Sequence, residues 1–408
     1  MLDQLGEDAE APKRESVSIL VGPNGSGKSF FLRKLANYHR HERSIVIVCN
    51  TPHDRFAGLR GVRRVSVGKI GGSPRTIVKN SVAQSLDGTS ADFYRISSTL
   101  EYCGYRGRFG FRIEANRNYQ EPLHVLRDQY LRRPRDADND DGDDVPVRDL
   151  APKFQLDVTE RDLDLAEGFL RRHDTSQPIW IDATGSVLEF SQSREFASVL
   201  RLESRLRTWG VIRDISVYLE RENGDVIEMH DASSGQLALI SSLLFIITST
   251  AQDPIVIVDE PENSLHPNWQ HEYVDKILVA LNYRNATLIL ATHAPLIVTG
   301  ALASSPKIVS VFEVRGEVLQ RLQIDSSEPP GSIEEILWRA FDVVTPANHF
   351  VSGRIVDEIS KFEKGEVTKV EVLTLLTRMK KESFDSRQQR FFDAVIQLLD
   401  KIETARIG

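Results

Sequence analysis

The chain has 408 residues, of which 40% are hydrophobic and 27% are charged, so it suits a soluble globular protein of two or three domains or of one elaborated domain. Its formal net charge of −8 argues against binding to nucleic acid through overall charge, although a local basic patch stays compatible with it. Two cysteines, Cys49 and Cys103, exclude a disulfide framework or a zinc cage, and the lack of a long apolar segment predicts a cytoplasmic protein without a signal peptide or membrane span.

The first elements in chain order predict a sheet that is covered on both faces. Residues 17–21 and 45–48 are continuous apolar runs, which are typical of strands buried on both sides. A helix is expected between them, from about residue 28 to residue 38. Residues 51–80 are rich in Gly, Arg and Ser and predict loop with short strands, whereas the alternation in residues 93–113 predicts antiparallel strands.

Alternation of helices and strands continues towards the C-terminus. The acidic run 136–144 lacks the Gly and Glu that a calcium-binding loop needs at its sixth and twelfth positions, so it is interpreted as a solvated loop. The remaining expected elements are helices at 121–133, 194–209 and 234–248, strands at 179–181, 212–219, 255–258 and 287–290, and a hairpin of 308–313 with 318–322.

A Pro-Pro-Gly break that ends at Gly331 marks a predicted domain boundary. Residues 1–330 form the predicted first domain, with an inserted segment at about 115–175 that includes the acidic loop. Residues 331–408 have the apolar periodicity of helices and predict a C-terminal helical domain, which Ser332 and Glu335 could begin as a capping box.

The turn after the first strand carries the phosphate-binding pattern G-x-x-x-x-G-K-[ST]. It lies between a predicted strand and a predicted helix, which is the context that the pattern needs. Its glycines let backbone N–H groups converge on an anion at a helix N-terminus. We expect Lys28 to reach the β- and γ-phosphates of ATP and Ser29 to ligate Mg²⁺. The predicted nucleotide-binding residues here are Gly22, Pro23, Asn24, Gly25, Ser26, Gly27, Lys28, Ser29 and Phe30.

Two carboxylates follow the apolar run that begins at Ile255. Asp259 and Glu260 stand at the end of this predicted strand, and ligands of open α/β sheets bind at the carboxyl ends of strands. We expect Asp259 to hold the Mg²⁺ shell and Glu260 to act as the general base that polarises the attacking water.

Three further motifs occur in an order that resembles ABC-type ATPases. Ala232-Ser-Ser-Gly-Gln236 precedes a long apolar helix and resembles their signature motif, with Ser234 where glycine is commonest. Asn263-Ser-Leu-His-Pro267 is similar to the loop after their acidic pair, and His293 looks like their switch histidine. Taken singly, each motif also suits an ordinary role as a helix cap, a turn or a core residue.

The resemblance covers about residues 16–313 and implies an α/β fold: an ABC-ATPase head with a mixed sheet and a phosphate-loop core, plus insertions and a C-terminal helical region. It also implies that ATP is sandwiched between two copies, where the signature of one copy completes the γ-phosphate shell of the other. A homodimer or a higher oligomer of dimers follows. A glutamine should link the nucleotide to the rest of the protein, and Gln84, Gln120 and Asn50 stay open as candidates. The implied signature contacts are Ser233, Ser234, Gly235 and Gln236, and the implied catalytic residues are Lys28, Glu260 and His293.

The sequence Pro-Glu-Asn-Ser-Leu-His-Pro after Glu260 looks like the SMC-like branch of this family. That branch includes ATPases of prokaryotic anti-phage systems, such as Septu, retron-associated and PARIS ATPases and the overcoming-lysogenisation-defect nucleases. No Asp-x-Asp follows residue 330, so we expect no nuclease domain of the last kind. The resemblance implies an ATPase switch that controls a separate effector protein, a nuclease, in phage defence. A transporter subunit is an alternative, and the long separation of Lys28 from Ser233 argues against it.

A DNA-binding repair ATPase, similar to SMC and RecF proteins, is the other alternative. Basic residues are frequent in the segments Arg55–Lys79 and Arg106–Arg117, which could contact nucleic acid or form a solvated face. Asp162 and Asp164 are interpreted as part of a solvated helix face. The basic candidates are Arg55, Arg60, Arg63, Arg64, Lys69, Arg75, Lys79, Arg106, Arg108, Arg112 and Arg117.

Overall fold

The computed structural model describes most of the chain, which folds as two compact units. The first contains Met1–Cys49, His53–Arg63 and Ala251–Gly408, and the second contains Asn50–Pro52 and Arg64–Thr250. No helix in the described ranges has both the length and the apolar character that crossing a membrane demands. The described residues are 15–51, 54–66, 73–87, 90–116, 121–132, 159–173, 177–182, 190–281, 284–316, 318–322, 336, 349–381 and 386–407.

A seven-stranded sheet with the order β11-β10-β1-β9-β8-β2-β3 forms the centre of the fold. Strands β10, β1, β9, β8 and β2 run parallel, and β11 pairs with β10 in the antiparallel direction. The mixed α/β sheet that we expected is therefore present. The strands are β1 (Ser16–Val21), β2 (Ile45–Cys49), β3 (Arg63–Ser66), β8 (Ile255–Asp259), β9 (Thr287–Ala291), β10 (Val309–Arg315) and β11 (Val318–Arg321).

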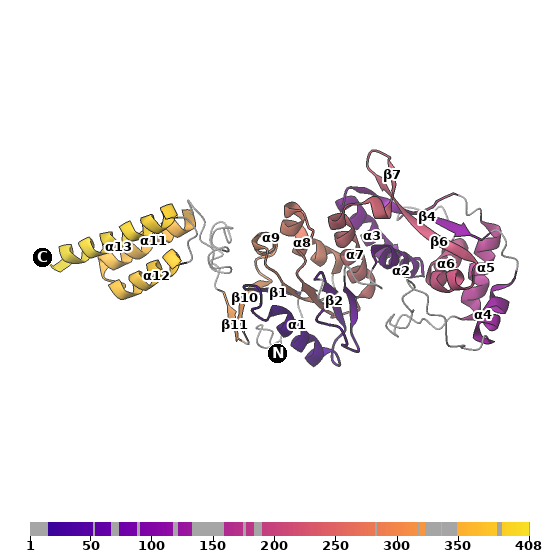
Figure 1. Cartoon of the computed structure of the whole chain (residues 1–408), viewed down its shortest axis with the longest axis horizontal. Coiled ribbons are helices and arrows are strands. Elements are labelled where there is room, and N and C mark those ends of the chain that lie inside the picture. The colour runs from indigo at the N-terminus through magenta and orange to yellow at the C-terminus, as the bar shows by residue number, and fades with distance from the viewer. Residues whose placement is uncertain are drawn as a thin grey trace, which may run out of the picture. The chain divides into compact units, whose positions relative to one another are not determined.

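Helices cover both faces of this sheet, with α1 on one side and α8 and α9 on the other (Figure 1). Alternate residues of the central strands, such as Ile45, Ile47 and Ile257, pack with Leu32 and Leu35 of α1 in one buried cluster. Burial on both faces explains why the strand sequences are continuous apolar runs. These helices are α1 (Lys28–His39), α8 (Pro267–Leu281) and α9 (Pro295–Ser304).

The second unit is built on an antiparallel four-stranded sheet with the order β5-β4-β6-β7. Phe109 and Phe111 of β4 are buried, and Phe111 packs edge-on against Phe196 of α6 at 5.4 Å between ring centroids. The elements are β4 (Tyr105–Ala115), β5 (Ile179–Asp182), β6 (Ile212–Arg221), β7 (Val226–Glu228), α2 (Pro74–Asp87), α3 (Ser90–Tyr102), α4 (Leu123–Arg132), α5 (Glu160–Arg172), α6 (Phe190–Thr208) and α7 (Ser234–Ser249).

Three helices near the C-terminus bury an apolar cluster of their own. Phe362 of α11, Leu376 and Met379 of α12 and Phe392 of α13 are its main members. The helices that we expected in residues 331–408 are thus present where the structure describes them. Their bounds are α11 (His349–Lys364), α12 (Lys369–Lys381) and α13 (Ser386–Ile407).

Two of the expected elements are wrong. The expected loop at 51–80 gives way to α2 from Pro74, and the first half of the expected strands at 93–113 is α3. In α3 the buried positions Phe93, Ile96 and Leu100 have the three- and four-residue spacing of a helix. The acidic run 136–144 and the Ser332 and Glu335 pair lie outside the described residues, and the domain boundary at residue 330 stays a prediction.

Candidate nucleotide-binding site

The phosphate loop rests against the turn of the β10–β11 hairpin. Gly22 and Gly27 have φ angles of 144° and 99°, which residues with a Cβ rarely adopt. A Cβ on Gly22 would lie 2.9 Å from the carbonyl oxygen of Val314, and one on Gly27 would lie 3.1 Å from that of Gly316. The Gly316 N–H donates to the carbonyl oxygen of Ser26 at 3.1 Å. These glycines therefore serve the hairpin contact as well as the phosphate loop itself.

Lys28 is the first residue of α1, and its side chain curls back over the loop. The ammonium donates to the carbonyl oxygens of Gly22 and Pro23 at 2.8 and 3.1 Å. Burial lowers the pKa of Lys28, and the charges of Glu260, Asp259 and Glu262 oppose that effect. The lysine, the loop and the acidic residues thus lie close together.

The remaining predicted binding residues of this segment are exposed. Pro23, Asn24 and Gly25 are exposed, and Phe30 is 48% exposed with the Lys34 ammonium 4.6 Å from its ring centroid. Exposed backbone at a helix N-terminus leaves N–H groups accessible to an anion.

Ser29 and Asp259 meet although they are far apart in the sequence. The Ser29 hydroxyl donates to Oδ1 of Asp259 at 3.1 Å. No group among the described residues donates a hydrogen bond to Oδ2 of Asp259, although this oxygen is buried. Burial raises the pKa of Asp259 to about 6, and the Ser29 hydrogen bond opposes this rise. A serine hydroxyl beside an unsatisfied carboxylate oxygen fits Mg²⁺, which prefers such oxygen ligands.

Glu260 and His293 face each other at the carboxyl ends of β8 and β9. Their Oε1 and Nε2 atoms are 3.6 Å apart, and the Glu260 N–H donates to the carbonyl oxygen of Ala291 at 2.9 Å. Glu260 has a φ angle of 52°, a strained conformation at the point where the chain leaves the strand. Burial, helped by Lys28, lowers the pKa of His293, so its imidazole is neutral at neutral pH.

Glu262 belongs to this site, and sequence reasoning missed it. One carboxylate oxygen accepts from the Thr292 hydroxyl at 2.9 Å, and the other accepts from the backbone N–H of His293. The only available signal was its position in the acidic Asp-Glu-Pro-Glu segment after β8. Asp259, Glu260 and Glu262 thus bring three carboxyl groups around Lys28.

The signature segment lies in the second unit, where Ser233 caps α7. Its hydroxyl accepts from the Gln236 N–H at 3.3 Å, and Oε1 of Gln236 accepts from the Ser233 N–H at 3.2 Å. This capping box is the ordinary role that the motif also suits. The Gln236 side chain is further anchored, because Tyr105 donates to its Oε1 at 2.9 Å and its Nε2 donates to the carbonyl oxygen of Cys103 at 3.0 Å. Ser233 and Ser234 are exposed and Gly235 is buried.

The candidates for the linking glutamine stay unresolved. Gln84 is on α2, where its side chain donates to the carbonyl oxygen of Thr248 at 2.9 Å. Asn50 follows β2 and is 9% exposed, and Gln120 lies outside the described residues.

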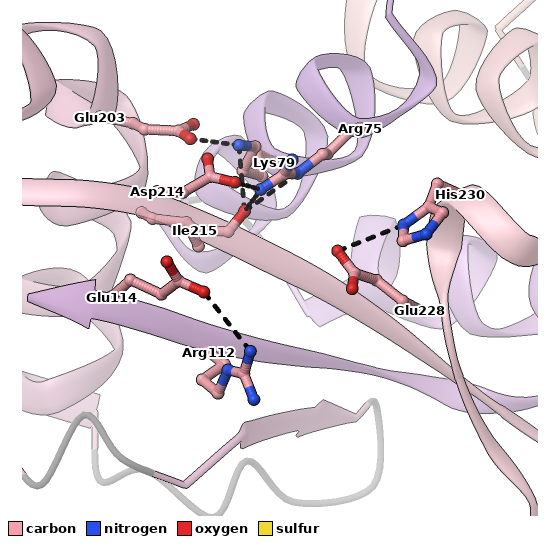
Figure 2. Close-up of polar contacts among 9 residues, drawn as sticks. All are labelled: Arg75, Lys79, Arg112, Glu114, Glu203, Asp214, Ile215, Glu228 and His230. Carbon is pink, nitrogen blue, oxygen red and sulfur yellow. Dashed lines mark hydrogen bonds and ion pairs between the residues drawn. The ribbon is translucent and has the colours of Figure 1, made fainter.

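Several basic residues that were candidates for nucleic-acid contact are paired with carboxylates. Figure 2 shows Lys79 against Glu203 and Arg75 against Asp214, and both basic side chains also reach the carbonyl oxygen of Ile215. Lys69 and Arg117 lie outside the described residues. Three further pairs occupy the β4–β6 sheet: Arg106 and Arg108 with Glu220, and Arg112 with Glu114. Asp164 is exposed as expected, whereas Asp162 is partly buried and pairs with Arg201 at 2.9 Å.

Two curated proteins match part of this chain. Over 109 residues, 24% of this chain and 21% of the relative, the chain is 31% identical to the "Retron Vc95 probable ATPase" of Vibrio cholerae serotype O1 biovar El Tor. Over 123 residues, 30% of this chain and 21% of the relative, it is 28% identical to the "Ribose import ATP-binding protein RbsA" of Pseudomonas putida. Each match thus spans about a fifth of the curated relative.

The profile of one protein family matches a longer part of the chain. The matched residues are 71–299, which are more than half of the chain and include the acidic pair and His293 but not the phosphate loop. Together with the mixed sheet and the Ser29–Asp259 contact, this match shows an ABC-like P-loop ATPase that resembles anti-phage ATPases. The chain belongs to the family described as "AAA domain, putative AbiEii toxin, Type IV TA system".

Proposed function

We propose that this protein binds and hydrolyses ATP between two copies of itself and thereby switches a separate effector protein. The observation that carries the proposal is the hydrogen bond from Ser29 to Asp259, because it joins the phosphate loop to the acidic pair in one site. Family membership supports an ATPase at the coarser level.

The residues of the first unit would have separate roles in ATP hydrolysis. Glu260 accepts a proton from water as the water oxygen attacks the γ-phosphorus, and the bond to the bridging oxygen of ADP breaks. Lys28 places its charge against the β- and γ-phosphates, and neutral His293 holds the water beside Glu260 at the 3.6 Å separation of their side chains. Positioning and electrostatics supply most of the catalysis in such reactions.

Ser29 and Asp259 would hold Mg²⁺, which when bound neutralises charge on the phosphates. Three carboxyl groups near one lysine disfavour the binding of a triphosphate that carries no metal ion. Binding of ATP should therefore depend on the divalent ion rather than proceed without it.

The second copy would supply Ser233 and the N-terminus of α7. The exposed Ser233 and Ser234 leave this helix end open to an anion, and the capping box fixes its direction. ATP would then hold two copies together, and hydrolysis would release them.

The similarity to a retron ATPase supports a role in anti-phage defence. In the proposed arrangement, the ATP-dependent dimer controls an effector encoded as a separate chain, and the family resemblance implies that this effector is a nuclease. The C-terminal helices α11–α13 are the proposed docking element.

The test of the proposal is Glu260→Gln, which keeps the shape of the side chain and removes the base. We expect the variant to bind ATP without turnover and to elute as a stable dimer in chromatography with ATP and Mg²⁺. Lys28→Ala should lose ATP binding, and Ser233→Arg should bind ATP but neither dimerise nor hydrolyse it. Wild-type turnover in Glu260→Gln would contradict the assigned base, and full activity in Ser233→Arg would remove the two-copy site.

Two alternatives have less support. The match to the ATP-binding protein of ribose import supports ATP binding, but the long separation of Lys28 from Ser233 argues against a transporter subunit. For a DNA-binding repair ATPase, the carboxylate partners of Arg75, Lys79 and Arg108 reduce the charge available to phosphates. Binding to duplex DNA that weakens steeply with salt would favour that alternative.

A further inference from the structure

Glu262 holds the loop that carries His293. The Thr292 hydroxyl and the His293 N–H donate to different oxygens of its carboxylate, so each oxygen accepts a hydrogen bond from one of two consecutive residues. A hydrogen bond from the backbone N–H of His293 fixes the backbone from which the side chain extends, but it does not fix the imidazole ring. Glu262 therefore acts on the backbone of His293 and not on its imidazole ring.

The same loop is tied to the sheet on its other side. Thr292 is fully buried, its N–H donates to the carbonyl oxygen of Leu20 at 3.1 Å, and its hydroxyl accepts from the Ala294 N–H at 2.9 Å. The N–H and the hydroxyl of Thr292 are thus both engaged, and among these three partners Glu262 alone contributes a charged side chain.

Glu262 also has little freedom of its own. It follows Glu260 by two residues, and burial raises its pKa while the hydrogen bonds from His293 and Thr292 oppose that effect. A partly buried carboxylate that accepts charge-assisted hydrogen bonds is a strong and directional anchor.

We propose that Glu262 is a positioning residue that sets His293 beside Glu260 for the attack of water. The inference rests on the proposed function, because it assigns Glu262 a part in the same hydrolysis. A displacement of about 1 Å in a group that orients the nucleophile can cost on the order of a hundredfold in rate.

The experiment is a double-mutant cycle of Glu262→Ala and His293→Ala, read by single-turnover and steady-state hydrolysis of ATP. We expect Glu262→Ala to lower kcat by about tenfold or more, with the dissociation constant of MgATP unchanged. If Glu262 acts through His293, the double variant should be no slower than His293→Ala alone. A residue that only stabilised the fold would give losses that multiply.

Glu272→Ala is the matched control, because Glu272 is an exposed glutamate on α8. It should hydrolyse ATP like the wild type. Glu262→Gln keeps one acceptor oxygen and should lie between wild type and Glu262→Ala in kcat. The cycle is repeated with this variant if thermal melting shows that Glu262→Ala is unfolded.

Wild-type kcat in Glu262→Ala, or multiplied losses in the double variant, would overturn the inference. Its failure is distinguishable from failure of the proposed function. If Glu260→Gln abolishes hydrolysis while Glu262→Ala does not, only the positioning role is wrong. If Glu260→Gln leaves hydrolysis intact, the proposed function itself is wrong.

Discussion

The carbonyl oxygen of His271 lies where a methyl group on Gly300 would have to be placed. A Cβ on Gly300 would stand 1.7 Å from that oxygen, so α8 and α9 touch backbone to backbone. Because both partners are main chain in packed helices, neither can move aside. Gly300→Ala is expected to destabilise the fold by about 3 kcal/mol, the upper part of the range for overpacking, as measured by chemical denaturation.

Gly353 provides the matched control for that change. It lies within α11, and a Cβ built on it meets no atom within 4 Å. Gly353→Ala should therefore stabilise its helix by up to about 1 kcal/mol, because alanine costs less conformational entropy than glycine. A destabilisation of equal size in both variants would contradict the packing argument at Gly300.

The sequence predicts the parts of the site that lie within single contiguous segments. The phosphate loop from Gly22 to Ser29 and the strand that ends at Asp259 are contiguous patterns, and a parallel sheet brings their ends to one edge. Glu262 could not be predicted from the sequence, because its contacts depend on the loop after β9 lying beside the loop after β8. No spacing within the sequence indicates that these two strands are neighbours.

The errors in the fold have a related cause. Glycines and aromatic residues between 93 and 113 suggest alternation, yet Phe93, Ile96 and Leu100 are buried on one face of α3 and β4 begins only at Tyr105. Packing against α7 and β4 determines which positions of α3 are buried. A single sequence does not report that packing.

The pair of Lys79 and Glu203 gives a prediction about stability. Their side chains are 5% and 14% exposed, so removing one partner leaves a buried charge. Lys79→Met should cost about 3 kcal/mol, whereas Lys79→Met combined with Glu203→Met should recover most of that loss. Denaturant titration of the two single variants and the double variant measures this. A double variant as unstable as the sum of the single variants would contradict it.

The same pair has a pH signature of defined sign. Burial, the largest cause, lowers the pKa of Lys79 below the ordinary 10.5, although Glu203 opposes it. Between the lowered value and 10.5 the unfolded chain binds more protons, so this lysine makes stability rise with pH in that window. The alkaline slope of the denaturation free energy should be smaller in the double variant than in the wild type.

Tyr105 tests the anchoring of the signature segment. Its hydroxyl donates to Gln236, which caps α7 together with Ser233. Tyr105→Phe removes only that donor, at a cost of about 1 kcal/mol, and should lower kcat several-fold while the Kd of MgATP stays unchanged. Tyr94→Phe, at a position that is 70% exposed, is the control and should behave like wild type. A change in nucleotide affinity with unaltered kcat would argue against this role.

The alkylation rate of the Cys103 thiol reports on the contacts that hold the Gln236 side chain. Burial raises the pKa of its thiol to about 12, so the native protein presents almost no reactive thiolate at pH 8. Alkylation should therefore be slow for Cys103 until the α3–β4 turn opens. Gln236→Ala removes the side chain that donates to the carbonyl oxygen of Cys103, and it should speed alkylation there. Cys49, buried in the cluster of α1 and the central sheet, is the internal control and should label equally slowly in both proteins. Peptide mass spectrometry over time separates the two sites, and equal acceleration at both would indicate general loosening of the fold instead.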